Sequence, residues 1–191
     1  MTINKEELRN IVECLLYVSS KPIKAGGIAS VIEDVTETDI KKTLIELSKE
    51  YDTANRPIFI QKVAGGWRMA TRKEYGKWVK KFYSRETTYN LTNAALETLS
   101  IVAYRQPVTT TEVEEIRGVS SGGVLRGLFE KRLIKIAGRK ETIGRPIIYR
   151  TTDKFLEYFG LESISDLPPL EELGIEDNLE ELIDGQYKKE D

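Results

Sequence analysis

Histidine is absent from this 191-residue sequence, and cysteine occurs once, at position 14. Without histidine the chain lacks the commonest general base and the commonest metal ligand in proteins. A single cysteine excludes a disulfide within the chain and any site built from several thiolates. A metal site would need carboxylate and carbonyl oxygens, and the D-x-D-x-D-G pattern of calcium loops does not occur. We therefore expect neither a metal nor a cofactor.

The motifs that bind phosphates and dinucleotides are also missing. The sequence contains neither G-x-x-x-x-G-K-[ST] nor G-x-G-x-x-G. Paired carboxylates such as Glu6/Glu7 and Glu114/Glu115 do occur, but they lie on amphipathic helical patterns, where charged residues usually face solvent. The sequence thus predicts no catalytic residues and a protein that is not an enzyme.

Long apolar runs are missing as well. No stretch of about 18 apolar residues is present, so no membrane-spanning helix is expected. The first ten residues are polar and acidic and do not resemble a secretion signal. We expect a cytosolic protein. Hydrophobic residues make up 40% of the chain and charged residues 31%, which is enough for one or two packed cores.

The clearest fold signal lies in residues 91–161, which begin with three short helical patterns. Thr92 is a candidate N-cap of the first helix, and Pro107 ends it. Thr109 and Glu112 have capping-box spacing at the start of the second helix, which Gly118 can close in a left-handed conformation. Ser120 or Ser121 caps the third. The predicted core residues recur at helical spacing: Leu96, Leu99, Val102, Ala103, Val113, Ile116, Val124, Leu125, Leu128 and Phe129.

Two strand-like runs, residues 133–137 and 147–151, follow these helices. A polar, glycine-containing wing, residues 138–146, joins the strands, and residues 153–159 form a closing helix that contributes Phe155, Leu156 and Phe159. This order of elements is that of the winged-helix form of helix-turn-helix. We therefore predict a winged-helix domain over residues 91–161.

Residues 1–84 repeat the same order. Lys21-Pro22-Ile23 precedes Gln106-Pro107-Val108 by 85 residues, and the apolar positions agree at that offset. The matched pairs are Ile28 with Val113, Val31 with Ile116, Ile40 with Leu125, and Leu44 with Phe129. We predict a hairpin whose turn takes positive φ at Gly65-Gly66, with Tyr75, Val79 and Phe82 in the closing helix. Cys14, between Leu8 and Leu15 on a helical pattern, is interpreted as a small core residue.

The sequence therefore predicts an α+β, mainly helical chain of two tandem winged-helix domains, at 1–84 and 91–161, joined by a polar linker at 85–90. Residues 161–191 hold eleven acids against Lys188 and Lys189, a net charge of −9 in a chain whose total is −2, so residues 1–160 carry +7. High charge and low hydrophobicity favour disorder in the tail, residues 162–191. Leucines and isoleucines punctuate its acids, so the tail is either solubilising or a partner-binding segment that folds on docking.

A winged helix raises the question of DNA, because its third helix commonly enters the major groove. Here that helix begins Ser120-Ser121-Gly122-Gly123, with no long polar side chain to contact base edges. Its counterpart in the first unit begins with Glu37 and Asp39, whose carboxylates repel phosphates. The basic wing allows phosphate contacts, which are weak and independent of sequence. A DNA-binding transcription regulator is therefore the alternative hypothesis.

Several runs closely resemble the segregation and condensation protein B (ScpB) family: LTNAALETLSIVAYRQPVT, EIRGVSSGGVLRGLFEKRLI, GRKETIGRPIIYRTTDKFLEYFGL and DLPPL. The resemblance covers residues 91–170, and Lys21-Pro22 and Gly65-Gly66-Trp67 extend it into the first unit. It implies a non-catalytic subunit of the bacterial condensin-like SMC complex, which condenses and segregates chromosomes before cell division. It also implies a homodimer, formed mainly through the N-terminal domain, that binds the kleisin ScpA. Contact with SMC is then indirect, and the protein is cytoplasmic and associated with the nucleoid.

Six polar residues of the second unit are the candidate contacts for the kleisin: Tyr104, Arg105, Gln106, Arg139, Lys140 and Arg145. The stretches that contain them have structural alternatives: Pro107 ends a helix, Gly144 and Pro146 shape a turn, and Arg105 pairs with an acid of its own chain. Four residues of the first unit are the candidate dimer interface: Leu8, Ile11, Leu15 and Trp67. Tryptophan is favoured at interface hot spots, and a core position is the alternative for Trp67.

Overall fold

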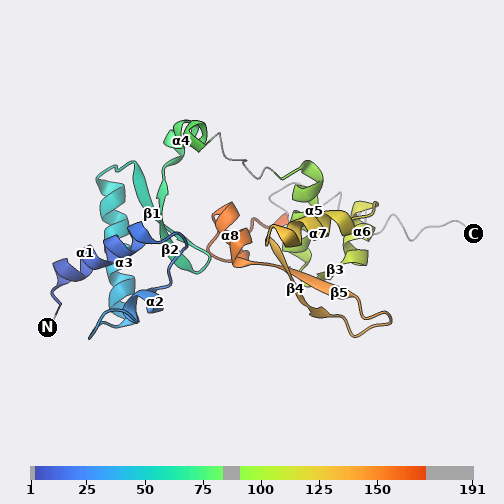
Figure 1. Cartoon of the computed structure of the whole chain (residues 1–191), viewed down its shortest axis with the longest axis horizontal. Helices are drawn as coiled ribbons and strands as arrows, with labels where there is room; N and C mark the ends of the chain where they lie inside the picture. The colour runs from blue at the N-terminus through green and yellow to red at the C-terminus, as the bar shows by residue number, and fades with distance from the viewer. Residues whose placement is uncertain (1–2, 84–90, 171–191) are drawn as a thin grey trace, which may run out of the picture. The chain divides into compact units, whose positions relative to one another are not determined.

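A computed structural model describes residues 3–83 and 91–170 of the chain. They belong to two compact units, Met1–Tyr89 with Gly160–Ser163, and Asn90–Phe159 with Ile164–Asp191. The fold is α+β and mainly helical, with one small antiparallel sheet in each unit (Figure 1). The predicted linker, residues 85–90, and residues 171–191 of the predicted tail lie outside the described residues.

Three helices, a β-hairpin and a last helix make up the first unit. They are α1 (Lys5–Val18), α2 (Ala25–Ala29), α3 (Glu37–Thr53), β1 (Ile58–Val63), β2 (Gly66–Thr71), the 3-10 turn η1 (Lys73–Tyr75) and α4 (Gly76–Tyr83). Asn4 caps α1, since its side-chain oxygen accepts a 2.9 Å hydrogen bond from the Glu7 amide. At the start of α3, Thr36 and Asp39 form a reciprocal capping box. Both caps satisfy amides that a helix leaves unpaired at its first turn.

The core of the first unit is apolar and comes from α1, α2, α3 and the hairpin. Its fully buried residues include Val12, Leu16, Ile28, Ile40, Leu44, Leu47 and Val63. Four predictions for this core are wrong. Val31 is exposed and Ile32 takes the inward position, and Cys14 is exposed. Phe82 on α4 is exposed, and Tyr75 is exposed and lies in η1 rather than in the closing helix. The 85-residue offset therefore predicts the inward position of Ile28 on α2 correctly but not that of Val31.

The hairpin turn differs from its prediction by one residue. Ala64 and Gly65 have positive φ, 49° and 67°, whereas Gly66 is the first residue of β2. Gly66 is required for a different reason: a Cβ there would lie 3.0 Å from the Ile23 carbonyl oxygen. This close approach occurs because Ile23 and Trp67 exchange two backbone hydrogen bonds, of 2.9 and 2.8 Å.

Residues 160–163 complete the first unit at this turn. The amides of Ala64 and Gly65 donate to the carbonyl oxygens of Leu161 and Glu162 at 2.8 and 3.0 Å, and Lys62 forms an ion pair with Glu162. The tip of a two-residue hairpin usually directs its amides to solvent, but here a segment almost a hundred residues later pairs with them.

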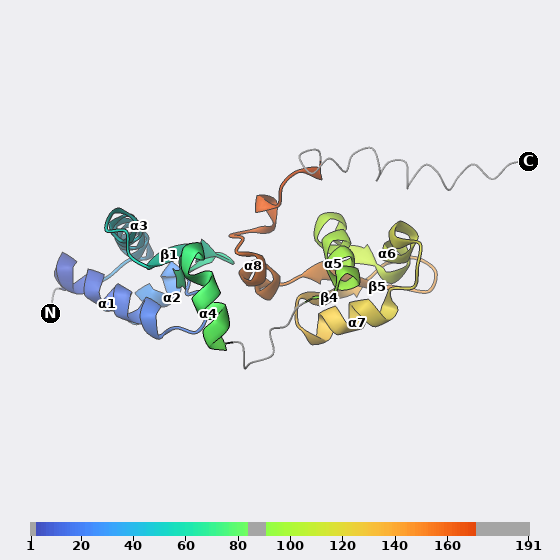
Figure 2. The same ribbon diagram turned by 90° about the horizontal axis from the view of Figure 1, so that it is seen from above.

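The second unit has the same order of elements with an additional short strand. They are α5 (Asn93–Arg105), β3 (Val108–Thr109), α6 (Thr110–Arg117), α7 (Gly122–Glu130), β4 (Ile134–Arg139), β5 (Ile147–Thr151), α8 (Asp153–Phe159) and the 3-10 turn η2 (Ile164–Asp166). The sheet has the order β3-β5-β4, all antiparallel. Figure 2 shows the far end of the β4–β5 hairpin beside α6.

Most helix boundaries of the second unit follow their sequence signals. Thr92 caps α5, Thr109 and Glu112 form the capping box of α6, and Gly118 ends α6 with a φ of 68°. Ser121 occupies the N-cap position of α7, but its hydroxyl makes no capping bond. The core includes Leu99, Val102, Val113, Leu125, Leu128 and Phe155. Leu96, Phe129 and Phe159 are 38%, 45% and 44% exposed, so their predicted inward positions are wrong.

One pairing is common to the two units. Ile23 bridges to Trp67 of β2 in the first unit, and 85 residues later Val108 of β3 pairs with Tyr149 of β5. In both, the residue after an X-Pro dipeptide adds an edge to the hairpin. Within the described ranges, no helix is long and apolar enough to cross a membrane.

Candidate functional site

The end of α5 carries three of the candidate contacts. The Tyr104 hydroxyl donates a 2.8 Å hydrogen bond to the carbonyl oxygen of Pro168. The Gln106 side-chain oxygen accepts from the amide and hydroxyl of Thr151 at 2.9 and 3.1 Å, and its Nε2 donates to Ala103. Arg105 between them is exposed. Tyr104 and Gln106 therefore hold neighbouring segments of their own unit in place, and Arg105 faces solvent.

Tyr104 and Gln106 line a groove of about 580 Å³ in the second unit. One side is the end of α5 together with Lys135 of β4 and Arg150 and Thr151 of β5. The other side is the segment 164–170, which the Tyr104–Pro168 hydrogen bond fixes. The groove thus combines apolar and proline side chains with two exposed cationic residues.

The wing carries the other three candidates and is ordered by its own hydrogen bonds. Arg139 is the last residue of β4, and Lys140 and Arg145 lie between β4 and β5. The Lys140 amide donates to Pro146 and the Arg145 amide to Thr142, both at 2.9 Å. The Arg139 guanidinium donates to the Arg145 carbonyl oxygen at 3.0 Å. At the tip, Ile143 is completely exposed. The wing therefore presents an apolar side chain beside two exposed arginines on a preformed loop.

An ion pair ties the wing to α6. Lys140 Nζ lies 2.5 Å from Glu112 Oε1, while the other carboxylate oxygen of Glu112 accepts from the Thr109 amide at 2.7 Å. The hydrogen bond from Lys140 is the largest cause that lowers the pKa of Glu112, and the Thr109 amide adds to it. One carboxylate therefore caps α6 and positions the wing.

The six candidates form two groups rather than one site. Gln106 bonds to Thr151 at the last position of β5, whereas the wing begins beyond Ile147 at its first. Four residue steps along a strand separate these positions by about 13 Å. A partner that contacts both groups must therefore extend along the β4–β5 hairpin.

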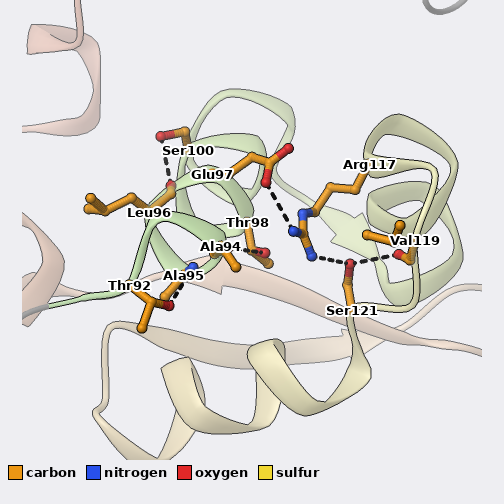
Figure 3. A network of polar contacts seen from close by, with 10 residues as sticks. All are labelled: Thr92, Ala94, Ala95, Leu96, Glu97, Thr98, Ser100, Arg117, Val119 and Ser121. Carbon is orange, nitrogen blue, oxygen red and sulfur yellow. Dashed lines mark hydrogen bonds and ion pairs between the residues drawn. The ribbon is translucent and has the colours of Figure 1, made fainter.

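The turn between α6 and α7 is fixed by a buried arginine (Figure 3). The side chain of Arg117 is 7% exposed and donates to Glu97 Oε2 on α5 and to the Ser121 hydroxyl, both at 2.9 Å. That hydroxyl in turn donates to the Val119 carbonyl oxygen at 3.1 Å. Arg117 therefore links three helices of the second unit around a single guanidinium.

A carboxylate holds the same turn from the other side. Glu114 accepts a 2.7 Å hydrogen bond from the Ser121 amide and a 3.2 Å bond from the Ser120 hydroxyl. The bond from the Ser121 amide is the largest cause that lowers the pKa of Glu114. The first residues of α7, Gly122 and Gly123, are exposed and have no side chain beyond hydrogen. The start of α7 is thus well ordered but offers no group that contacts base edges.

The four candidate dimer residues lie in the first unit and are half-buried. Leu8, Ile11, Leu15 and Trp67 all pack against its core. Ile11 and Leu15 also line a shallow groove of about 450 Å³ on α1, together with the exposed Cys14. The outer face of α1 thus has an apolar floor that remains accessible.

The sequence interpretation missed a larger apolar surface on α4. Trp78, Phe82 and Tyr83 are 57%, 81% and 57% exposed and surround a hollow of about 600 Å³, and no residue of α4 is buried. Lys77 Nζ lies 4.0 Å from the centre of the Trp78 ring. The run GKWVKKFY alternates basic and aromatic residues, which is a signal for a surface helix with one aromatic face. The analogy with the closing helix of the second unit instead predicted that Phe82 faces the core.

Among the residues that the structure describes, no cluster of three or more acids and cysteines is placed to hold a metal ion. The surfaces found are grooves, a wing and an aromatic helix face. Such features are suited to bind polypeptide chains.

Known proteins of one family match almost the whole chain. The sequence model of the segregation and condensation complex subunit ScpB matches residues 10–170. "Segregation and condensation protein B" of Moorella thermoacetica is 45% identical over 168 residues, 88% of this chain and 85% of that protein. The protein of the same name from Bacillus cereus is 42% identical over 188 residues, 98% of both chains.

A solved structure is also similar in sequence. The crystal structure of ScpB from Mycobacterium tuberculosis is 33% identical and covers 84% of this chain and 99% of that chain, with a TM-score of 0.42. A family match over more than four fifths of the chain, with relatives above 40% identity across their own length, is decisive. The chain belongs to the segregation and condensation protein B (ScpB) family, the non-catalytic subunits of the SMC complex that takes part in chromosome segregation and condensation.

Proposed function

We propose that the chain acts as a homodimer that binds the kleisin ScpA and reaches SMC through it, in the cytoplasm at the nucleoid. The observation that carries this proposal is the surface of the second unit. Its wing presents Ile143 beside Arg139 and Arg145 on a preformed loop, while the start of α7 offers only glycines. A surface of this kind suits a polypeptide better than a base-pair edge.

Both units are proposed to be winged-helix domains. Each has three helices, a β-hairpin and a short strand or bridge that pairs with the hairpin, which is the order the winged helix requires. The first unit is proposed as the dimerisation domain and the second as the kleisin-binding domain. This division is supported by where the exposed apolar surfaces lie, on α1 and α4 in the first unit and at the wing in the second.

Kleisin binding is tested by calorimetric titration of the full-length chain with the central segment of ScpA. We expect a Kd below about 1 μM, equivalent to about −8 kcal/mol or better. The triple variant Arg139→Ala/Ile143→Ala/Arg145→Ala should weaken binding at least about tenfold. Loss of one well-packed apolar contact and two charged contacts is sufficient for that effect.

The matched control removes one isoleucine and two cationic side chains from α3. Lys42, Ile45 and Lys49 are exposed there, and Lys42→Ala/Ile45→Ala/Lys49→Ala should bind ScpA as the wild type does. Because Arg139 also bonds within the wing, Ile143→Asp alone serves as a variant that leaves those bonds in place. Equal affinity of wild type and both wing variants would refute the wing as the contact.

Dimer formation is tested by size-exclusion chromatography with light scattering. We expect a dimer at micromolar concentration, and Ile11→Glu should shift it toward monomer by placing a charge on the floor of the α1 groove. Tyr17→Glu changes an exposed residue of the same helix outside that groove and is the control. A wild-type chain that is strictly monomeric at these concentrations contradicts the proposed assembly.

DNA contact is proposed to be non-specific at most. A titration of duplexes of unrelated sequence at physiological salt should give equal, weak affinities that fall with added salt. A transcription regulator would instead prefer one sequence, and an Arg126→Ala or Arg139→Ala change would relax that preference. Such a preference, without affinity for ScpA, would replace the proposal with the alternative hypothesis.

A further inference from the structure

Two like charges face each other across the sheet of the second unit. Lys135 of β4 and Arg150 of β5 are direct cross-strand partners. Both side chains are exposed and line the same groove, so they lie on one face of the sheet. Like charges directly opposite each other destabilise a β-ladder. Neither has an ion pair or side-chain hydrogen bond with another residue in the part of the chain that the structure describes. The pair is thus suited to an anionic ligand.

The chain itself leads into this groove. Residues 164–170 form its second wall, held by the hydrogen bond from Tyr104 to Pro168, and Leu170 is one of its lining residues. The next two residues in the sequence are Glu171 and Glu172, which begin the 21 residues that follow the described part. A residue's Cα lies 3.8 Å from that of its neighbour, so Glu171 and Glu172 start within about 8 Å of a groove residue.

We propose that the acidic segment 171–184 of this chain docks in this groove, with the carboxylates of Glu171 and Glu172 paired to Lys135 and Arg150. Two anionic side chains then meet two cationic ones, and the cross-strand repulsion is offset. The adjacent apolar residue, Leu173, follows these acids toward a groove that already contains Leu167 and Leu170. Chain connectivity supplies a high effective concentration, so weak individual contacts are enough for occupancy.

Charge complementarity supports this occupant over an apolar one. Residues 161–191 carry −9 and residues 1–160 carry +7. Docking in the groove also covers Tyr104 and Gln106, which form its α5 side. An occupied groove would therefore shield one of the two candidate groups for partner contact and leave the wing open. The inference does not depend on the proposed kleisin binding, since it concerns contacts within the second unit.

The sequence contains its own control for a test. The tripeptide Glu-Glu-Leu occurs at 171–173 and again at 180–182, so a glutamate-specific endopeptidase meets the same local chemistry twice. The full-length chain is digested briefly, and the cleavage rates after Glu172 and after Glu181 are compared by mass spectrometry. We expect cleavage after Glu172 to be at least about threefold slower, as two exposed ion pairs suppress opening by a few-fold or more.

Two double variants decide whether the basic pair is the cause. In Lys135→Ala/Arg150→Ala the two sites should be cut at similar rates. In Lys42→Ala/Lys154→Ala, which removes two exposed lysines elsewhere, the protection at Glu172 should remain. Equal rates at both sites in the wild type overturn the proposal. Protection that persists in Lys135→Ala/Arg150→Ala also overturns it, because nearness to the folded unit would then account for the slow cleavage.

A second measurement separates the chain's own segment from an acidic partner. A fluorescent peptide with the sequence of residues 171–184 is titrated into the full-length chain and into a chain that ends at Leu170. We expect binding to the shortened chain that is lost in its Lys135→Ala/Arg150→Ala form, and at least about threefold weaker binding to the full-length chain. Equal binding to both chains would mean that the groove is open to an external acidic segment, and the docked tail would be refuted.

Discussion

For the buried guanidinium of Arg117, we expect that removing its carboxylate partner destabilises the second unit more than removing the guanidinium itself. The Arg117 side chain is 7% exposed, whereas that of Glu97, its only carboxylate partner among the described residues, is 55% exposed. Glu97→Gln keeps a neutral amide oxygen that can accept from Arg117, but it leaves the buried cation without an anionic partner. Arg117→Met removes the cation and retains most of the apolar stem.

The magnitudes follow from burial. Breaking a fully buried ion pair from one side costs about 3–5 kcal/mol. Because water reaches Glu97, we expect Glu97→Gln to destabilise the second unit by about 1–2 kcal/mol. Nε of Arg117 is buried and has no hydrogen-bond partner in the described structure, so replacing the side chain also removes an unsatisfied donor. Arg117→Met should therefore lie within about 1 kcal/mol of the wild type.

The assay must report on the second unit alone. Both tryptophans, Trp67 and Trp78, lie in the first unit, so tryptophan fluorescence serves as an internal control that should not change. Native-state hydrogen exchange of α5 and α6 amides gives the opening free energy of the second unit. The double variant Glu97→Gln/Arg117→Met should be no less stable than Arg117→Met, a coupling of about 1–2 kcal/mol. If Arg117→Met is the more damaging single change, or if the two changes are additive, the buried-charge argument fails.

Three further predictions concern pH and backbone. Burial is the main cause that raises the pKa of Tyr51 to about 12. The stability that the neutral Tyr51 side chain contributes is complete below the ordinary pKa of 10 and is lost as pH rises to 12. Tyr51→Phe should abolish this loss of stability at high pH, as measured by tryptophan-monitored unfolding. The pKa of Glu112 is lowered, chiefly by its hydrogen bond from Lys140. The stability that the Glu112 carboxylate contributes is present above the ordinary pKa of 4.5 and is lost in more acidic solution. Glu112→Gln should therefore reduce the fall in hydrogen-exchange protection of α6 at low pH, and an unchanged fall would contradict this. Gly127→Ala should stabilise the second unit by about 1 kcal/mol, because no heavy atom beyond its own turns of helix lies within 4 Å of the added Cβ. Gly66→Ala should destabilise the first unit by about 1–3 kcal/mol, because its Cβ would clash with the backbone of Ile23. Thermal unfolding measures both changes, and a less stable Gly127→Ala or a more stable Gly66→Ala would refute the respective prediction.

Local signals in the sequence were sufficient to predict most element boundaries. Capping residues such as Thr92 and Thr109, the stop at Pro107 and the left-handed Gly118 act within a few residues, so they can be identified without tertiary structure. Burial was predicted less well, because it depends on which side of a helix meets its neighbours. Phe129 is at helical spacing with Leu125 but lies on the edge of that face and is exposed.

The long-range contacts could not be predicted from the sequence. The pairing of residues 161–162 with the turn at Ala64 and Gly65 joins segments almost a hundred residues apart, and no local pattern marks it. The Arg117–Glu97 pair and the opposition of Lys135 and Arg150 likewise depend on helix packing and strand register. Tyr104 and Gln106 stand out locally as polar residues at the end of a helix, but their hydrogen bonds to Pro168 and Thr151 join segments 64 and 45 residues away.

The distribution of paired and unpaired cations gives the strongest physical reason to look for polypeptide partners on the second unit. Arg117, Arg126 and Lys140 each face a glutamate of the same unit, so the positive charge around α6 and α7 is largely neutralised. Four cations at the wing and the groove face no carboxylate within the described ranges: Arg139, Arg145, Lys135 and Arg150. A DNA reader requires the reverse arrangement, with its positive charge unpaired along the third helix. The four cations along the β4–β5 hairpin form a row that an extended acidic segment can follow from the groove to the wing.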